Sequence, residues 1–160
     1  AAARVARLTH WEDDNADASV LWCLSIRHAI RTGELYVLGQ VDALPSDRRD
    51  RWRALIEEAQ ATGAHPRDFA AQNGWVVRAF QGALAAVAGA ATPTDALERA
   101  VHGGNDTDTV AAIAGALAGA VFGADALPAG LVERVYGWPD LRGEDLVVLA
   151  DAAAGGVDAS

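Results

Sequence analysis

The chain has 160 residues, and 22 acidic against 13 basic side chains give it a net charge of −9. This length accommodates one domain with a hydrophobic core but not two full domains. The acidic charge argues against nucleic acid and anionic membranes as partners, and no segment reaches the ~20 apolar residues that a membrane span requires.

Apolar residues recur at three- and four-residue spacing along most of the chain, which predicts an all-α fold. The predicted helices span residues 17–32, 46–63, 65–72, 75–89, 93–101 and 106–123, followed by a short helix from Pro128 and a last one over 144–154. Ser46 and Thr92 stand as N-caps, and Gly33 as a C-terminal stop. Residues 35–41 are too short and interrupted to form a strand.

Small side chains make residues 106–123 a candidate for close helix packing. Its face of small residues consists of Ala112, Gly115, Ala116 and Gly119. Because these side chains let another helix approach closely, we expect this helix to lie centrally and to be among the most buried.

Other conspicuous side chains have structural explanations. The single cysteine, Cys23, excludes an internal disulfide and a zinc site built from cysteines, so we expect a cytoplasmic protein and a small buried thiol. We expect the tryptophans to fill the core or a groove and the arginines of one segment to form a solvated face, where one could bind a pyrophosphate. These residues are Trp22, Trp52, Trp138, Arg48, Arg49, Arg51 and Arg53.

An acidic turn opens the helix over 106–123. Asp106 and Asp108 are two residues apart, Thr109 follows, and Gly103 and Gly104 precede them and supply positive φ angles. Carboxylate and hydroxyl oxygens suit a hard divalent cation such as Mg²⁺. Aspartates at a helix start also act as ordinary caps that stabilise the dipole by about 0.3–1 kcal/mol each, and spacing alone leaves both interpretations open.

Two other motifs fail at this turn. An EF-hand that starts at Asp106 would place Val110 and Ala111 where an oxygen ligand and a glycine are needed. A phosphotransferase of the haloacid dehalogenase type requires a buried strand before the first aspartate, and residues 102–105 cannot form one.

The acidic turn extends into a longer pattern that is specific. It reads Gly104-Asn105-Asp106-Thr107-Asp108-Thr109-Val110-Ala111-Ala112-Ile113-Ala114-Gly115-Ala116-Leu117-Ala118-Gly119-Ala120, then Gly123 and Leu127-Pro128, and it resembles the C-terminal signature of the ADP-ribosylglycohydrolases. Three further segments, Leu8-Thr9-His10, Asn73-Gly74-Trp75-Val76-Val77 and Gly137-Trp138-Pro139, also resemble that family. Asn105 stands where glycine is commoner.

The resemblance implies a compact orthogonal helical bundle with a centre of two Mg²⁺ ions, or of Mn²⁺. Asp106, Asp108 and Thr109 would be the metal ligands, with Asp108 as the bridge and both aspartates as catalytic residues. Two cations about 3.5–4 Å apart can orient a water and stabilise charge on the leaving side.

The resemblance also implies a substrate site, for which ordinary structural roles remain as alternatives. His10 would lie at the ADP-ribose cleft, or be a surface histidine. Asn73, Gly74 and Trp75 would line the adenosine end beside Asn105, or be a helix N-cap followed by a core tryptophan. His102 is interpreted as a helix-end residue rather than a ligand.

The family's N-terminal motifs, a Gly-Asp-Ala-x-Gly stretch and an Asp-Asp-Thr metal motif, are not found in this sequence. We therefore expect residues 1–154 to be the C-terminal half of a single domain, followed by a frayed tail over 155–160, with the N-terminal half as a required partner. The isolated chain would then be inactive and bind metal weakly.

Three functions are compared. The first is a hydrolase that releases ADP-ribose from a modified protein or a small conjugate, at an arginine, serine or acetyl linkage. The others are a non-catalytic relative that has kept the fold, and a module that binds ADP-ribose without cleaving it. The composition, rich in alanine and arginine, is typical of a bacterial genome.

Overall fold

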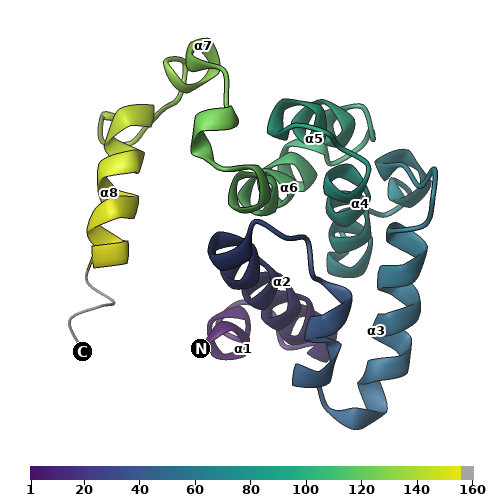
Figure 1. Cartoon of the computed structure of the whole chain (residues 1–160). Helices are drawn as coiled ribbons and strands as arrows, with labels where there is room; N and C mark the ends of the chain where they lie inside the picture. The colour runs from purple at the N-terminus through teal and green to yellow at the C-terminus, as the bar shows by residue number, and fades with distance from the viewer. Residues whose placement is uncertain (156–160) are drawn as a thin grey trace. The chain divides into compact units, whose positions relative to one another are not determined.

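Helices make up most of the chain, so the all-α prediction is confirmed (Figure 1). A computed structural model describes residues 1–155, which divide into two compact units, Ala1–Ala124 and a second that begins at Asp125. The first unit contains α1 (Ala2–Ala6), α2 (Asp13–Thr32), the 3-10 helix η1 (Leu38–Ala43), α3 (Ser46–Ala59), the 3-10 helix η2 (Pro66–Phe69), α4 (Val76–Ala88), α5 (Pro93–Val101) and α6 (Thr107–Phe122).

The core of the first unit is built around α4. This helix is apolar on nearly every side, and ten consecutive or near-consecutive side chains are buried: Val77, Ala79, Phe80, Gln81, Gly82, Ala83, Leu84, Ala85, Ala86 and Val87. The rings of Trp22 and Trp52 meet Phe80 edge-on, with centroid distances of 5.1 and 5.2 Å. Such pairs contribute about 0.5–1.5 kcal/mol each beyond their buried area. Trp22 and Trp52 therefore fill the core, as predicted.

Helix α6 packs against α2, α4 and α5, as its central placement required. The expectation that α6 would be among the most buried helices is wrong, because four of its residues are buried against ten in α4, and the face that it buries also differs from the expected one. Val110, Ala114, Leu117 and Ala118 are buried, whereas Ala112 and Ala116 are exposed. The larger apolar side chains decide which face turns inward, because burying them removes more apolar surface from water.

Three helices of the first unit begin at the same end. Trp22 Nε1 donates to the Ile113 carbonyl, and Gly33 lies near Val121, so α2 and α6 advance in the same direction. Gly74, just before α4, lies near Asp106, just before α6, so α4 begins beside the start of α6. The first turns of α2, α4 and α6 are therefore at one end of the unit.

Two of the three predicted helix boundaries show their predicted chemistry, whereas Ser46 is the first residue of α3 and Pro45 is its N-cap. Gly33 ends α2 in the left-handed region, with φ 72°, which glycine adopts without steric cost. Thr92 Oγ1 accepts from the Asp95 N–H at the start of α5. His102 follows α5 as its C-cap, so its interpretation as a helix-end residue is confirmed.

The second unit contains η3 (Ala124–Ala126), α7 (Ala129–Val132), β1 (Tyr136–Gly137), β2 (Leu141–Arg142) and α8 (Gly143–Gly155). The two strands are antiparallel, with Tyr136 opposite Arg142. Trp138 lies in the turn between them and is 91% exposed, so its predicted role in the core or a groove is wrong. Along α8, four adjacent apolar side chains are exposed: Leu146, Val147, Val148 and Leu149.

Further differences from the sequence predictions concern short elements and one side chain. Helix α1 and the β1–β2 pair were not expected, because segments of five and two residues carry too little periodicity to be recognised. Cys23 is exposed rather than buried. None of the described helices has the length and apolarity needed to cross a membrane. The frayed tail was predicted over residues 155–160, and the part of it after residue 155 lies outside the described residues.

Candidate functional site

The turn before α6 has an unusual backbone. Gly104 and Asn105 both have positive φ angles, 91° and 58°, a conformation that residues other than glycine rarely adopt. The sequence predicted positive φ angles at both Gly103 and Gly104, and only Gly104 has one. At Gly103 a glycine is needed because a side chain would not fit. A Cβ at Gly103 would lie 2.9 Å from both Pro66 Cβ and the Ala100 carbonyl oxygen.

A buried asparagine holds this turn from the side of α4. Asn73 is 5% exposed, its Nδ2 donates to the Gly104 carbonyl at 3.1 Å, and its Oδ1 accepts from the Asp106 N–H at 3.1 Å. Asn105 Nδ2 donates in return to the Ala70 carbonyl at 2.9 Å. The turns at 70–73 and 104–106 are therefore joined by three side-chain hydrogen bonds. We call the second of these, residues 103–106, the acidic-turn loop.

The aspartates at the start of α6 are not engaged as caps in the ordinary way. Asp106 occupies the N-cap position, yet within the described chain its side chain makes no capping hydrogen bond. Asp108 and Thr109 lie in the first turn and are exposed, and Asp106 is half-buried. The interpretation of Asp106 as a side-chain cap therefore fails, and its carboxylate remains available.

The donor chemistry of this turn fits Mg²⁺ or Mn²⁺. Two carboxylates and a hydroxyl supply only hard oxygen ligands, which these cations prefer. Among residues 1–155, however, no group of three or more histidine, cysteine, aspartate or glutamate side chains converges. The acidic turn thus accounts for part of a coordination shell.

Gly74 and Trp75 border the acidic turn. A Cβ at Gly74 would lie 3.9 Å from Asp106 Oδ2, so the two loops are adjacent. Trp75, rather than Asn73, is the N-cap of α4, and its indole is 45% exposed. The alternative of an asparagine cap followed by a core tryptophan is therefore wrong.

His10 lies in the segment between α1 and α2. Its side chain is exposed, and its Nδ1 is 3.0 Å from Thr9 Oγ1. Because α2 and α6 begin at the same end of the unit, His10 lies at the end that carries Asp106. The roles of His10, Asn73, Gly74, Trp75 and Asn105 in binding substrate stay predictions.

Sequence analysis missed a charged network at the start of α2. Arg48 donates to Asp17 and, at 2.7 Å, to Asp14, while Arg51 donates to Asp14 at 3.0 Å. The buried Asp17 also accepts from Trp52 Nε1 at 2.9 Å. The paired spacing of Asp14 with Asp17 and of Arg48 with Arg51 was the available signal. We call these four charged residues and Trp52 the arginine network.

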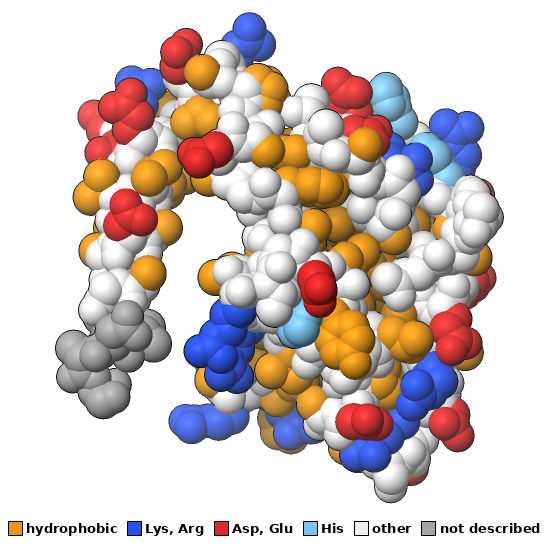
Figure 2. Space-filling view, in the orientation of Figure 1, with side chains coloured by type: hydrophobic (Ala, Val, Ile, Leu, Met, Phe, Trp, Pro, Cys, Tyr) orange, Lys and Arg blue, Asp and Glu red, His pale blue; other side chains and the backbone are white. Residues whose placement is uncertain are grey.

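The arginine network perturbs the protonation of its members. Hydrogen bonding from Arg51 lowers the pKa of Asp14, against a smaller opposing effect of burial. The hydrogen bond to Asp17 raises the pKa of Arg48. The expected solvated arginine face is thus wrong for Arg48, and Figure 2 shows acidic and basic side chains interspersed where α3 lies in Figure 1.

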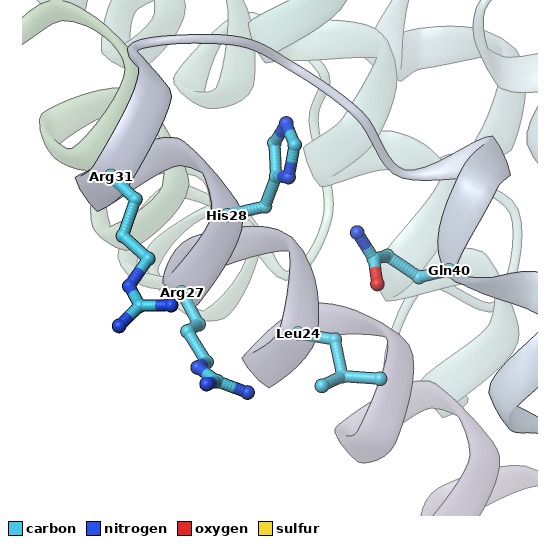
Figure 3. A pocket seen from close by; sticks show the side chains of 5 residues that line it. All are labelled: Leu24, Arg27, His28, Arg31 and Gln40. Atoms are coloured by element: carbon cyan, nitrogen blue, oxygen red, sulfur yellow. The ribbon is translucent and has the colours of Figure 1, made fainter.

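A separate pocket of about 220 Å³ lies at the other half of α2. Its lining residues are Leu24, Arg27, His28, Arg31 and Gln40. In Figure 3 the Gln40 amide points toward α2, whereas the two arginine side chains extend away from it. The guanidinium groups do not converge with the amide, so the pocket does not form a second candidate site.

Comparisons with known proteins agree with the sequence resemblance. The family model described as ADP-ribosylglycohydrolase matches residues 1–159. The chain is 32% identical over 121 residues to a protein of Pseudomonas putida (strain GB-1) named ADP-ribosylarginine hydrolase Tri1, a match that covers 76% of this chain.

The matched region spans only 33% of that relative's length. No solved structure matches the chain. The family model nevertheless extends over both units, from α1 through the whole of α8. The chain belongs to the ADP-ribosylglycohydrolase family.

Proposed function

We propose that this chain contributes the acidic turn of a metal-dependent hydrolase that cleaves the glycosidic bond of ADP-ribose. The observation that carries the proposal is the helix start at α6, where Asn73 holds the backbone and the Asp106 side chain makes no capping hydrogen bond in the described chain. Family membership supports the reaction class. The relative named ADP-ribosylarginine hydrolase makes ADP-ribosylated arginine the first substrate to test.

Asp106, Asp108 and Thr109 would hold two Mg²⁺ ions, with Mn²⁺ as the alternative. When bound, such ions supply an activated water and stabilise charge on the leaving group. The chain's own residues would position the ligands and bind the substrate. Asn73 fixes the turn from which the ligands project, and the half-exposed Trp75 offers an indole face on which an adenine can stack.

Two carboxylates and one hydroxyl fill only part of a ligand shell, and we propose that water and a further segment of the protein supply the rest. We propose that the chain alone binds Mg²⁺ weakly and does not turn over substrate. This also keeps a second function open, because a non-catalytic relative or an ADP-ribose-binding module would have the same acidic turn without completing the shell. A cytoplasmic location stays a prediction.

The test is an assay for release of ADP-ribose from ADP-ribosylated arginine. The chain is assayed alone and joined to the N-terminal part of the Pseudomonas putida relative, with Mg²⁺, with Mn²⁺ and with a chelator. We expect release from the joined protein only, loss with the chelator, and loss by several orders of magnitude in Asp108→Ala. Metal-independent release, or full activity of Asp108→Ala, would contradict the mechanism.

Substrate binding without release separates the second function from the first. If the joined protein binds ADP-ribose in a calorimetric titration but releases none in any metal, the binding-module interpretation replaces the hydrolase. The control for Asp108→Ala is Asp47→Asn, which changes another exposed aspartate in the first turn of a helix. It should leave both readouts unchanged.

A further inference from the structure

Asn73 is a buried amide whose two ends both bind the backbone of the acidic-turn loop. We propose that Asn73 is the positioning residue of this loop: it orients Asp106 and the first turn of α6 without touching the metal or the substrate. The proposal deepens the proposed function, on which it rests for what the carboxylates bind. The resemblance to the family had implied direct substrate binding for this residue.

The two hydrogen bonds fix the loop at two points. Asn73 Nδ2 binds the Gly104 carbonyl and Oδ1 binds the Asp106 N–H, so the amide spans the residue with φ 58°, Asn105. A single contact would leave the loop free to pivot, whereas two contacts on either side of Asn105 set both its position and its orientation. Asp106 is the residue at which the chain then enters α6.

Asn73 also pairs one of the backbone donors at the start of α6. The first N–H groups of a helix have no partner within the helix, and an N-cap side chain commonly accepts from one of them. Here the Asp106 side chain makes no such bond in the described chain, while its own N–H is bound by Asn73. The backbone is thus held by a neutral amide, which leaves the carboxylate to a cation.

An amide is the side chain that fits this position. The Gly104 carbonyl needs a donor and the Asp106 N–H needs an acceptor, and a buried asparagine offers both at once. An aspartate would keep the acceptor but turn a second acceptor toward the Gly104 carbonyl. Because Asn73 is 5% exposed, water cannot readily replace a lost bond.

The experiment measures amide hydrogen exchange by NMR and Mn²⁺ affinity by titration on the whole chain. In Asn73→Ala we expect exchange of the Asp106 N–H to rise by about tenfold or more, the factor for loss of one hydrogen bond. Mn²⁺ affinity should fall by a similar factor. In Asn73→Asp the Asp106 N–H should stay protected, because the acceptor is retained.

Gln81→Ala is the matched control. Gln81 is a fully buried amide on α4 that binds the Leu55 carbonyl at 3.1 Å and Glu58 at 2.7 Å, away from the loop. Its loss should lower stability without changing Asp106 exchange or Mn²⁺ affinity by more than about twofold, when all proteins are compared at equal folded fraction. Equal effects of Gln81→Ala and Asn73→Ala would overturn the positioning role.

The readouts separate this proposal from the proposed function. If the wild-type chain binds no Mn²⁺ but Asn73→Ala still frees the Asp106 N–H, positioning holds and the metal site fails. If the wild type binds Mn²⁺ and Asn73→Ala binds it equally tightly, positioning is wrong and the metal site stands. Should Asn73→Ala not fold, a freely exchanging Asp106 N–H in the wild type overturns positioning.

Discussion

Two polar clusters at one end of the first unit use their carboxylates differently. In the arginine network, Asp14 and Asp17 accept hydrogen bonds from arginines and an indole. At the start of α6, the described chain shows no ion pair to Asp106 or Asp108. Asn73 holds the backbone there instead.

This difference separates carboxylates that are paired within the fold from carboxylates that are in no ion pair of the described chain. A carboxylate that neutralises a partly buried arginine contributes to stability and is occupied. A carboxylate that projects from a backbone held by a neutral amide remains free to bind a cation. The following predictions test that division, from the largest expected effect to the smallest.

The largest effect is expected from Asp17→Ala in the arginine network. The Asp17 side chain is 9% exposed and accepts from Arg48 and Trp52 Nε1. Its removal leaves the buried Trp52 indole N–H without a partner and takes from Arg48 one of its carboxylate partners, so we expect a cost of about 3 kcal/mol. Urea denaturation measures the free energy of unfolding.

Asp106→Ala makes the same substitution in the acidic turn as Asp17→Ala makes in the arginine network. Its carboxylate makes no capping bond in the described chain, so we expect a change within about 0.5 kcal/mol, as for other substitutions away from buried partners. A loss in Asp106→Ala as large as that in Asp17→Ala would show that both clusters hold the fold and would remove the comparison.

The second prediction tests whether backbone contact fixes the acidic-turn loop. In Gly103→Ala the new Cβ would lie 2.9 Å from Pro66 Cβ and from the Ala100 carbonyl oxygen, so the loop must shift. Overpacking of this kind costs about 1–3 kcal/mol. The free energy of unfolding is again the readout.

Gly119→Ala provides the matched control for the same chemical change. No atom lies within 4 Å of a Cβ there, and the residue is inside α6. Alanine in a helix interior is more favourable than glycine by roughly 0.5–1 kcal/mol. The two variants should therefore change stability in opposite directions, and a Gly103→Ala variant that loses no stability would refute the tight contact at Gly103.

The sequence predicted the helices well because their signals are local. The segment 75–89 is apolar on nearly every side, and α4 is the core helix that this composition requires. The cap at Thr92 and the stop at Gly33 depend on residues within one turn, and both were recovered. Short-range chemistry was sufficient for these boundaries.

Long-range contacts could not be predicted in the same way. The hydrogen bonds from Asn73 to Gly104 and Asp106 join residues 31 and 33 positions apart, and no periodicity indicates them. The arginine network joins Asp17 to Arg48 across a similar separation. The family pattern indicated which residues matter at the acidic turn, but only the structure shows that Asn73 holds it.

The third prediction concerns Mg²⁺. A ligand that binds only the folded chain stabilises it by RT ln(1 + [L]/Kd), which is about 1.4 kcal/mol at ten times Kd. We expect Mg²⁺ or Mn²⁺ to raise the melting temperature of the wild type, and this shift to disappear in Asp108→Asn. Asp47→Asn, in the first turn of α3, should retain it. Loss of the shift in Asp47→Asn as well would indicate general screening of the negative charge.

The smallest effect is a pH dependence beneath the acidic-turn loop. His65 caps η2 by accepting from the Arg67 N–H at 3.2 Å, and η2 carries the Pro66 that contacts Gly103. Burial, and then the nearby Arg67, lowers the pKa of His65 from its ordinary value of 6.5. The folded chain therefore takes up this proton less readily than the unfolded chain does.

The sign of the effect follows from that difference. The contribution of neutral His65 is complete above about pH 6.5 and is lost as the pH falls through the lower pKa of the folded chain. Asp14, whose pKa is lowered from 3.8, keeps its contribution throughout this range and loses it only under stronger acid. A comparison of the free energy of unfolding at pH 7.5 and pH 5.5 thus tests the support that η2 gives to the acidic-turn loop. It leaves the Asp14 ion pairs of the arginine network intact.

His65→Asn is the variant that isolates this titration, because its side-chain oxygen can still cap η2 but does not take up a proton in this range. We expect the wild type to lose up to about 1 kcal/mol more than His65→Asn between pH 7.5 and pH 5.5, since loss of an N-cap costs about that much. Thermal unfolding followed by circular dichroism gives both values. If the two proteins lose stability equally, His65 does not support the acidic turn through its neutral form, and the pH dependence arises from another titrating group.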